Sequence, residues 1–284
     1  MRKLRIILEM IKFEHTVFAL PFAFLGAALA ARGLPGWSAS LGILGAMVGA
    51  RSAAMAFNRL ADRHFDAANP RTANRPLPQG ELSLRFVLLF IVAGVVLFFL
   101  STAWLNPLTL KLAPIALVIV LCYSYTKRFT SFSHLFLGLA LAIAPVGGWV
   151  AVTGTLAWDP FILAGAVLFW VAGFDIIYSC QDVTFDRNAG LFSLPSRYGI
   201  RRALQVAAFF HVLMVTLLAV TFQLQALSIL SWVGLLIVAG SLLYEHSIVT
   251  PTDLSRVDVA FFTLNGVVSL ALLLFVGLDL CLLV

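Results

Sequence analysis

Long stretches of almost uncharged residues recur along the whole chain, and they constrain the fold more than any other feature of the sequence. Residues 86–104, for example, contain no charged side chain. A helix of about 20 such residues crosses the roughly 30 Å hydrocarbon core of a bilayer. The hydrophobic share of 61% also exceeds the apolar share of about half that is usual in soluble domains. The chain is therefore predicted to be an all-α integral membrane protein, embedded in a lipid bilayer.

Nine of these stretches are expected to form transmembrane helices within a single domain that covers residues 1–284. They lie at residues 16–31, 41–57, 86–104, 108–125, 135–152, 161–180, 203–222, 226–243 and 259–280. Residues 1–12 are basic, but the apolar stretch that follows has no clear small-residue cleavage site. It is therefore predicted to be the first span rather than a signal peptide.

The positive charges of the predicted loops fall almost entirely on one side of the membrane. With the N-terminus in the cytoplasm, the outer side keeps only Arg32 and Lys111, while the inner loops and the N-terminal segment hold nearly all the rest. Cytoplasmic loops usually carry such an excess. We therefore predict a multi-pass protein of the inner (plasma) membrane whose charge-rich loops face the cytoplasm. This topology explains the net charge of +6 without a nucleic-acid partner.

A first polar stripe lies at the inner end of the second predicted span. Asn58, Asp62 and Asp66 are spaced four residues apart, so on an α-helix they line one face over roughly 12 Å. Arg51 falls on the same stripe, and Pro70 is expected to end the helix. Two carboxylates and an amide oxygen suit a hard divalent cation.

A plainer interpretation of this first stripe is a solvated helix end whose acids pair with Arg59 and Arg63. A second stripe of the same kind makes it less plausible that the first is a coincidental pair of surface acids. Asp182 and Asp186 are again four residues apart, at the inner end of a later span, with Asp175 and Tyr178 on the same face. An ionisable residue inside a membrane span, as Asp175 is predicted to be, usually faces a cavity or a partner.

Four carboxylates gathered at one membrane face would repel one another unless counter-ions were present. Two divalent cations would neutralise them, and an anionic phosphate group could complete the metal shells. The basic residues expected to clamp that phosphate are Arg71, Arg75, Lys127, Arg128 and Arg187. Tyr123 and Lys127 are four residues apart at the end of another span, where a snorkelling lysine and an interfacial tyrosine are the plainer interpretation. Together these features predict a diphosphate site next to a membrane.

The segments "NRLADRHFD", "RTANRPLPQG", "YSYTKR" and "QDVTFDR" together resemble the UbiA superfamily of intramembrane prenyltransferases. The resemblance implies nine helices around a central cavity that opens towards lipid. It also implies a polyprenyl diphosphate bound through Mg²⁺, with two ions held by the two aspartate motifs. On this sequence the motif residues are Asn58, Asp62, Asp66, Asp182 and Asp186, and the Tyr and Lys of the intervening motif are Tyr123 and Lys127.

One departure from the family pattern bears on the substrate. Many relatives have Asp where this chain has Arg59, and the second motif lacks the extra acids of typical ubiquinone-pathway enzymes. The segments "IKFEHTVFALPFAF" and "GARSAAMAFNRLADR" look more like the branch that prenylates 1,4-dihydroxy-6-naphthoate in the futalosine route to menaquinone, whose members are often labelled 4-hydroxybenzoate polyprenyltransferases. The function implied is Mg²⁺-dependent transfer of a polyprenyl group to an aromatic carboxylic acid of one of these two types, in respiratory quinone biosynthesis.

Individual roles follow from that chemistry. Arg51 is predicted to bind the carboxylate of the aromatic acid, and the rings of Phe57, Phe174 and Tyr178 could stabilise an allylic cation. Two other classes compete. A CDP-alcohol phosphotransferase also uses acids at membrane helix ends, but its clustered DG…AR…G…D…D signature is absent. A secondary transporter could use Asp175 for ion coupling, yet it would not need two matched acidic stripes.

Overall fold

The computed structural model describes residues 2–11 and 16–282. Within them the chain forms long helices and contains no β-strand. The long helices are α2 (Thr16–Ala31), α3 (Trp37–Ala61), α5 (Leu84–Leu105), α6 (Pro107–Thr126), α7 (Ser133–Thr153), α8 (Asp159–Ser179), α11 (Ile200–Leu224), α12 (Ile229–Ile248) and α13 (Asn265–Leu282). The predicted all-α membrane fold is confirmed. Eight helices of the described part are long and apolar enough to cross a membrane, and α2 is a shorter apolar helix.

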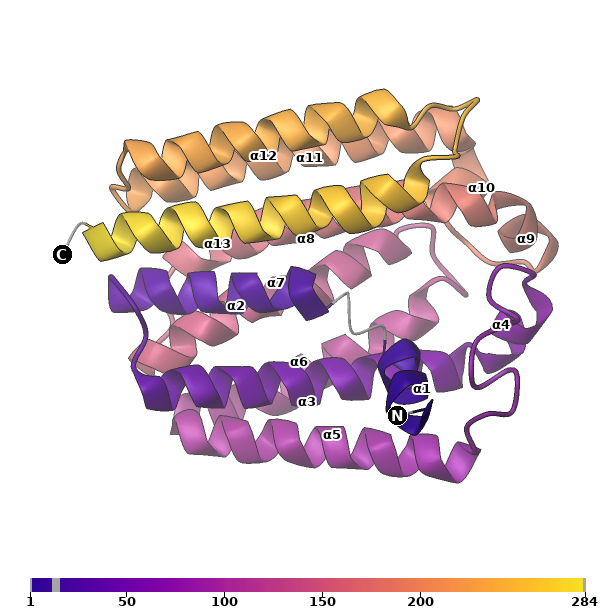
Figure 1. Cartoon of the computed structure of the whole chain (residues 1–284), viewed down its shortest axis with the longest axis horizontal. Coiled ribbons are helices and arrows are strands. Elements are labelled where there is room, and N and C mark those ends of the chain that lie inside the picture. The colour runs from indigo at the N-terminus through magenta and orange to yellow at the C-terminus, as the bar shows by residue number, and fades with distance from the viewer. Residues whose placement is uncertain (1, 12–15, 283–284) are drawn as a thin grey trace.

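The long helices lie side by side, and the short helices gather at one end of the bundle (Figure 1). These short helices are α4 (Arg63–Ala68), α9 (Val183–Asn188) and α10 (Leu194–Tyr198). We call this end of the bundle, with the loops between its helices, the capped end. Helix α13 runs away from the capped end and finishes at the opposite one, while α1 (Arg2–Met10) lies against α3.

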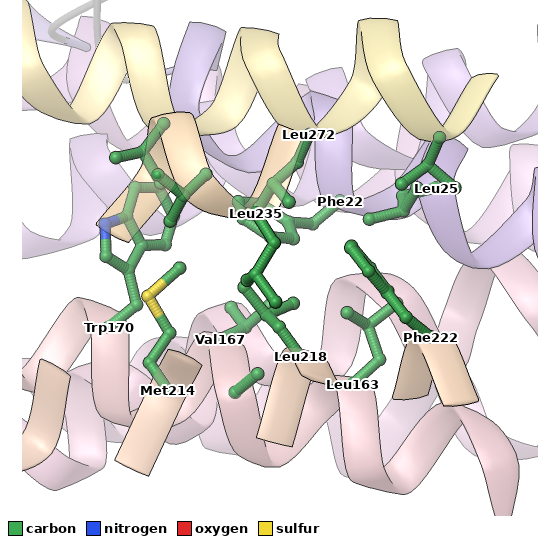
Figure 2. Packing of buried hydrophobic residues seen from close by; sticks show 14 of the residues in the cluster. Phe22, Leu25, Leu163, Val167, Trp170, Met214, Leu218, Phe222, Leu235 and Leu272 are labelled. Atoms are coloured by element: carbon green, nitrogen blue, oxygen red, sulfur yellow. The ribbon is translucent and has the colours of Figure 1, made fainter. Parts of the chain in front are cut away.

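Helix α8 passes through the most tightly packed part of the molecule. Figure 2 shows its Trp170 and Val167 among buried side chains of α2, α11, α12 and α13. The Trp170 ring lies 4.9 Å from that of Phe22 and 5.1 Å from that of Phe174. Because lipid tails are as apolar as these side chains, the cluster is stabilised by van der Waals packing rather than by removal of apolar surface from water. It fixes the position of α8, which carries Asp175 and Tyr178 of the predicted site and leads into the turn that contains Asp182.

Glycines allow two pairs of helices to approach closely around the region where the site forms. A methyl group on Gly148 of α7 would overlap the backbone of α2 at Ala23. A methyl group on Gly49 of α3 would likewise overlap the backbone of α5 at Phe98 and Gly94. Small residues at such crossings are typical of membrane helix interfaces.

Each acidic stripe lies where a long helix is interrupted, so the prediction of an unbroken helix up to Pro70 was wrong. Helix α3 ends at Ala61 and α4 begins at Arg63, while α8 is followed by the 3₁₀ turn η2 (Cys180–Asp182) and then α9. Asp62 has φ −94° and ψ 6°, and Asp182 has φ −100° and ψ 6°, values typical of residues in tight turns and active sites. The four-residue spacing survives, because the Asp66 amide still donates to the Asp62 carbonyl at 2.8 Å.

A second irregularity precedes α13. Residues Val259–Leu264 form a π-helix, η3, which is a rare conformation that is frequent at functional sites. The Asn265 side chain stabilises it by donating to the Phe261 carbonyl at 3.0 Å. Its Oδ1 accepts a hydrogen bond of 2.7 Å from Trp170 Nε1. The π-helix is thereby attached to α8, and its Phe261 packs against Tyr178 with ring centroids 4.2 Å apart.

Candidate active site

A polar cavity lies among the helix ends of the capped end, and most of the predicted site residues line it. Its walls come from α3, α4, α6, α7, α8, η2, α9, η3, the segment between α4 and α5, and the loop after α9. The predicted residues in its lining are Arg51, Asn58, Asp62, Asp66, Arg71, Arg75, Tyr123, Lys127, Asp175, Tyr178, Asp182 and Asp186. The fold therefore brings together two aspartate pairs that are far apart in the sequence.

An apolar cavity continues from the polar one between α2, α3, α5, α6 and α7. Small and aliphatic side chains make up most of its lining. Arg51, Tyr123 and Leu141 line both cavities and so mark their junction. The Nε atom of Arg51 is buried and has no hydrogen-bond partner among the described residues. Arg51 thus brings a guanidinium group with an unsatisfied donor to this junction, and guanidinium groups pair with anionic groups of ligands.

Asp62 is bound by two cations from the end of α6. Lys127 Nζ lies 2.8 Å from Asp62 Oδ2, and Arg128 Nη2 lies 3.3 Å from Asp62 Oδ1. Arg128 also donates to the carbonyl of Ala61 at 2.7 Å and stacks over the rings of Phe65 and Tyr125. Arg128 thus holds the end of α3 in place and does not itself line the polar cavity.

Asp66 is bound by arginines on both sides of it. Arg75 Nη1 lies 2.6 Å from Asp66 Oδ1, and Arg59 Nη1 lies 3.8 Å from Asp66 Oδ2. The interpretation of Arg59 as a neighbouring counter-ion therefore has a structural basis. Arg59 is itself buried, and its Nε donates to the carbonyl of Met10 in α1. Asp66 Oδ2 is buried and makes no hydrogen bond within the described residues.

Asp182 is bound by Arg71 and Asn69, which both lie in the segment after α4. Arg71 Nε donates to its Oδ1 at 2.9 Å and Arg71 Nη2 to its Oδ2, a two-pronged pair, while Asn69 Nδ2 donates to Oδ1 at 3.0 Å. Arg71 Nη1 also donates to the Tyr178 hydroxyl at 2.8 Å. Burial alone would lower the pKa of Arg71, but its hydrogen bonds and charge interactions with Asp182 and Tyr178 raise that pKa above its usual value.

Asp186 is held differently from the other three carboxylates. It accepts a hydrogen bond of 2.8 Å from the Ser193 hydroxyl, and among the described residues no Lys or Arg forms an ion pair with it. The counter-ions that four gathered carboxylates require are therefore supplied in part by Lys and Arg side chains of the protein itself. Protein cations already balance three of the four charges, so a diphosphate that enters with divalent cations would exchange partners within an existing network.

Besides Arg128, three further predicted residues are oriented differently from the prediction or lie elsewhere. Asn58 directs its Nδ2 towards Asp62 Oδ2 at 3.3 Å, and its Oδ1 accepts from Arg59 Nη1 at 3.4 Å, so its amide oxygen is occupied by Arg59. Arg187 lies outside the cavity lining and donates to the Ser196 carbonyl at 2.9 Å. Phe57 lines neither cavity and packs against Tyr125. Phe174 and Tyr178 do line the polar cavity.

The polar residues of the lining that sequence reasoning missed include Asn69, Ser124, His134 and Ser193. Asn69 lies 113 residues from its partner Asp182, and Ser193 lies in the loop after α9. A helical-face argument covers only neighbours along one helix, so it could not pair these segments. The sequence offered one signal for such a residue, because His134 is a polar side chain at the start of an apolar span.

The donor set of the polar cavity suits divalent cations that bring part of their coordination shell with them. Within the described residues, no group of three or more His, Cys, Asp and Glu side chains forms a complete metal centre. Mg²⁺ usually takes one or two carboxylates and completes its shell with water and substrate phosphates. Two aspartate pairs facing a cavity, with one buried carboxylate oxygen lacking a hydrogen bond, therefore fit Mg²⁺ that arrives together with a diphosphate.

Comparison with known proteins agrees with this architecture. A model of the UbiA prenyltransferase family matches residues 19–283. The 4-hydroxybenzoate octaprenyltransferase of Nitrosospira multiformis is 31% identical over 242 residues, which are 85% of this chain and 83% of the relative. The apo structure of a UbiA homologue from Aeropyrum pernix K1 is 35% identical, with a TM-score of 0.86 over 94% of this chain and 98% of its own.

A more distant UbiA homologue, from Archaeoglobus fulgidus, was solved with DMAPP and Mg²⁺ bound. It shares the fold at 22% identity, with a TM-score of 0.78 over 98% of this chain and 99% of its own. The fold and the relatives together define the chain as a membrane-embedded prenyltransferase. The chain belongs to the UbiA prenyltransferase family, as its motifs predict.

Proposed function

We propose that this enzyme transfers a polyprenyl group from a polyprenyl diphosphate to an aromatic carboxylic acid, in a Mg²⁺-dependent step of respiratory quinone biosynthesis. The observation that carries this proposal is the junction of two unlike cavities. The polar cavity offers carboxylates and basic groups for a diphosphate, and the apolar cavity offers a lining that suits an isoprenoid tail. A substrate with a charged head and a long hydrocarbon tail matches both.

The basic residues of the polar cavity would bind and orient the diphosphate. Arg71, Arg75 and Lys127 each already contact a carboxylate oxygen there, and phosphate oxygens are equivalent partners for these groups. Positive groups held at the leaving diphosphate stabilise the charge that develops as the C–O bond breaks. The UbiA homologue from Archaeoglobus fulgidus was solved with DMAPP and Mg²⁺ bound, which supports a prenyl diphosphate as the ligand.

Asp62, Asp66, Asp182 and Asp186 would hold Mg²⁺, with Asn58 close enough to join them after a rotation of its amide. Bound Mg²⁺ would supply Lewis-acid stabilisation to the departing diphosphate. Tyr178, Phe174 and Phe261 present aromatic rings to the same cavity. Ring faces stabilise a nearby cation, and the apolar walls keep water away from it.

The acceptor ring is assigned to the junction of the two cavities, with its carboxylate on Arg51. The unpaired Nε of that residue is the supporting observation. Arg59 and the absence of extra acids from the second aspartate motif favour the bicyclic 1,4-dihydroxy-6-naphthoate as acceptor. The relatives named 4-hydroxybenzoate octaprenyltransferases favour the single-ring 4-hydroxybenzoate. We propose the naphthoate as the preferred acceptor.

The acceptor proposal is tested by direct competition. The purified protein in lipid nanodiscs would receive a polyprenyl diphosphate, Mg²⁺ and both acids at equal concentration, with the products identified by mass. A pocket shaped for two rings aligns a single ring poorly with the allylic cation, which lowers the rate as well as the affinity. We expect the higher kcat/KM for the naphthoate. A clear preference for 4-hydroxybenzoate would overturn the acceptor choice and leave the prenyltransferase assignment intact.

A further inference from the structure

Asp175 of α8 lines the polar cavity, and its partner is a histidine rather than an arginine or lysine. His134 Nδ1 lies 2.7 Å from Asp175 Oδ2. The other ring nitrogen of His134, Nε2, lies 3.3 Å from the backbone nitrogen of Leu194, which can only donate. His134 Nε2 therefore accepts, and Nδ1 carries the proton that His134 donates to Asp175. The histidine is buried and neutral in this arrangement.

The second oxygen of Asp175 makes no hydrogen bond with the described residues, and the side chain is 26% exposed within the cavity lining. Asp62, Asp66 and Asp182 differ from it because each is neutralised by at least one Arg or Lys. A carboxylate that has a fixed orientation, a neutral partner and a free oxygen facing a cavity is arranged to accept a proton.

The depth of Asp175 matches the expected position of the acceptor ring. Asp175 precedes Asp182 by seven residues on α8, and Arg51 precedes Asn58 by seven residues on α3. Both helices run towards the capped end, and seven residues correspond to about 10 Å of helix. Arg51 and Asp175 therefore lie at similar depths below the acidic stripes. An aromatic acid with its carboxylate on Arg51 has its ring at the level of Asp175.

We propose that Asp175 is the catalytic base that removes the ring proton, and that His134 is the positioning residue that orients it. This inference rests on the proposed function. The C–O bond of the allylic diphosphate breaks with its electron pair on the leaving diphosphate, and a π pair of the ring forms the new C–C bond. The ring C–H pair then restores aromaticity as Asp175 Oδ1 takes the proton, so no oxidant or reductant is needed.

An isotope effect on the acceptor tests the proposal. Purified protein in nanodiscs would receive geranyl diphosphate, Mg²⁺ and acceptor carrying either hydrogen or deuterium at the ring position that is alkylated. In the wild type, proton loss is fast and the ratio of the two rates is near unity. In Asp175→Asn, transfer falls by about a hundredfold, and the ratio rises well above unity because proton loss becomes limiting. Release of diphosphate in the absence of acceptor stays at the wild-type rate.

The His134 variants separate orientation from general damage. In His134→Asn the side-chain nitrogen lies near the position of Nδ1 and keeps the hydrogen bond to Asp175, so most of the transfer rate is retained. His134→Ala removes that donor, lowers the rate and shows the isotope effect. Asp159→Asn is the matched control, since Asp159 lies at the other end of α8 and binds Gln225. It keeps the wild-type rate and an isotope ratio near unity.

Four outcomes overturn the inference and can be told apart. Asp175 is not the base if Asp175→Asn transfers the prenyl group at the wild-type rate. It is also not the base if that variant is slow but its isotope ratio stays near unity. Loss of acceptor-free diphosphate release in that variant shows that Asp175 serves the diphosphate instead. A wild-type protein that releases diphosphate with Mg²⁺ but alkylates no aromatic acid refutes the proposed function itself, and the inference falls with it.

Discussion

Asp186 is the residue at which a test of the metal assignment is cleanest. It has no Arg or Lys partner among the described residues, so its substitution leaves no cation unpaired. Asp186→Asn should lower Mg²⁺-dependent turnover by about a thousandfold, which corresponds to about 4 kcal/mol of transition-state stabilisation, and should leave the melting temperature unchanged. Asp253→Asn, in the exposed loop before η3, is the control and should be fully active. Near-normal turnover in a folded Asp186→Asn protein would show that the metal site is misassigned.

Arg71 and Arg187 allow a second test on single residues. Both were predicted from the sequence to bind the phosphate, but only Arg71 lines the polar cavity. Arg71 binds Asp182 and Tyr178 in the cavity, whereas Arg187 donates to Ser196 outside it. Arg71→Gln should raise the KM for the polyprenyl diphosphate at least about tenfold, the loss of one charged hydrogen-bonded contact. Arg187→Gln should change it little. Equal effects of the two substitutions, measured by steady-state kinetics, would contradict the placement of Arg71 as the phosphate ligand.

The helix crossings that shape the apolar cavity depend on single glycines. Gly148→Ala would force α2 and α7 apart, because the new methyl group meets the Ala23 backbone. Overpacking of this kind typically costs about 1–3 kcal/mol, so the melting temperature should fall. The neighbouring Gly147→Ala is a matched control, since a methyl group there meets nothing within 4 Å. If both variants melt alike, the close crossing does not exist in the bilayer.

The helices and the acidic stripes were predictable from the sequence, while the connections between them were not. Apolar length predicted the spans, and the spacing of Asp62 and Asp66 predicted a shared face, because both signals come from residues that are close together in the sequence. The turns at Asp62 and Asp182 left no comparable mark in the residue pattern. Contacts such as that between Asn69 and Asp182 join segments 113 residues apart. No pattern within either segment indicates which distant residue it will contact.

The orientation of the whole molecule in the membrane stays a prediction from its charge distribution. Single cysteines introduced at Gln79 and Asn188, which are exposed at the capped end, should react with an impermeant thiol reagent from the cytoplasm only. A cysteine at Thr155, an exposed residue at the opposite end, should react from the outside only. The background would lack Cys122, Cys180 and Cys281. Labelling of position 79 or 188 from the outside would reverse the topology.

The central claim is that the apolar cavity holds the isoprenoid tail while the polar cavity holds its diphosphate. Ala116 lines the apolar cavity on α6, seven residues and so about 10 Å before the junction residue Tyr123. Ala116→Phe should block long tails and leave short ones unaffected. Val118→Phe, on the exposed face of the same helix, should impair neither long nor short tails.

The decisive measurement is kcat/KM for octaprenyl and geranyl diphosphate in Ala116→Phe, Val118→Phe and wild-type protein, with Mg²⁺ and a fixed acceptor. We predict that Ala116→Phe lowers kcat/KM for octaprenyl diphosphate at least about tenfold, which corresponds to about 1.4 kcal/mol. The same variant should keep a near wild-type kcat/KM for geranyl diphosphate. Equal losses for both donors, or no loss for either, would contradict the claim that the tail occupies this cavity.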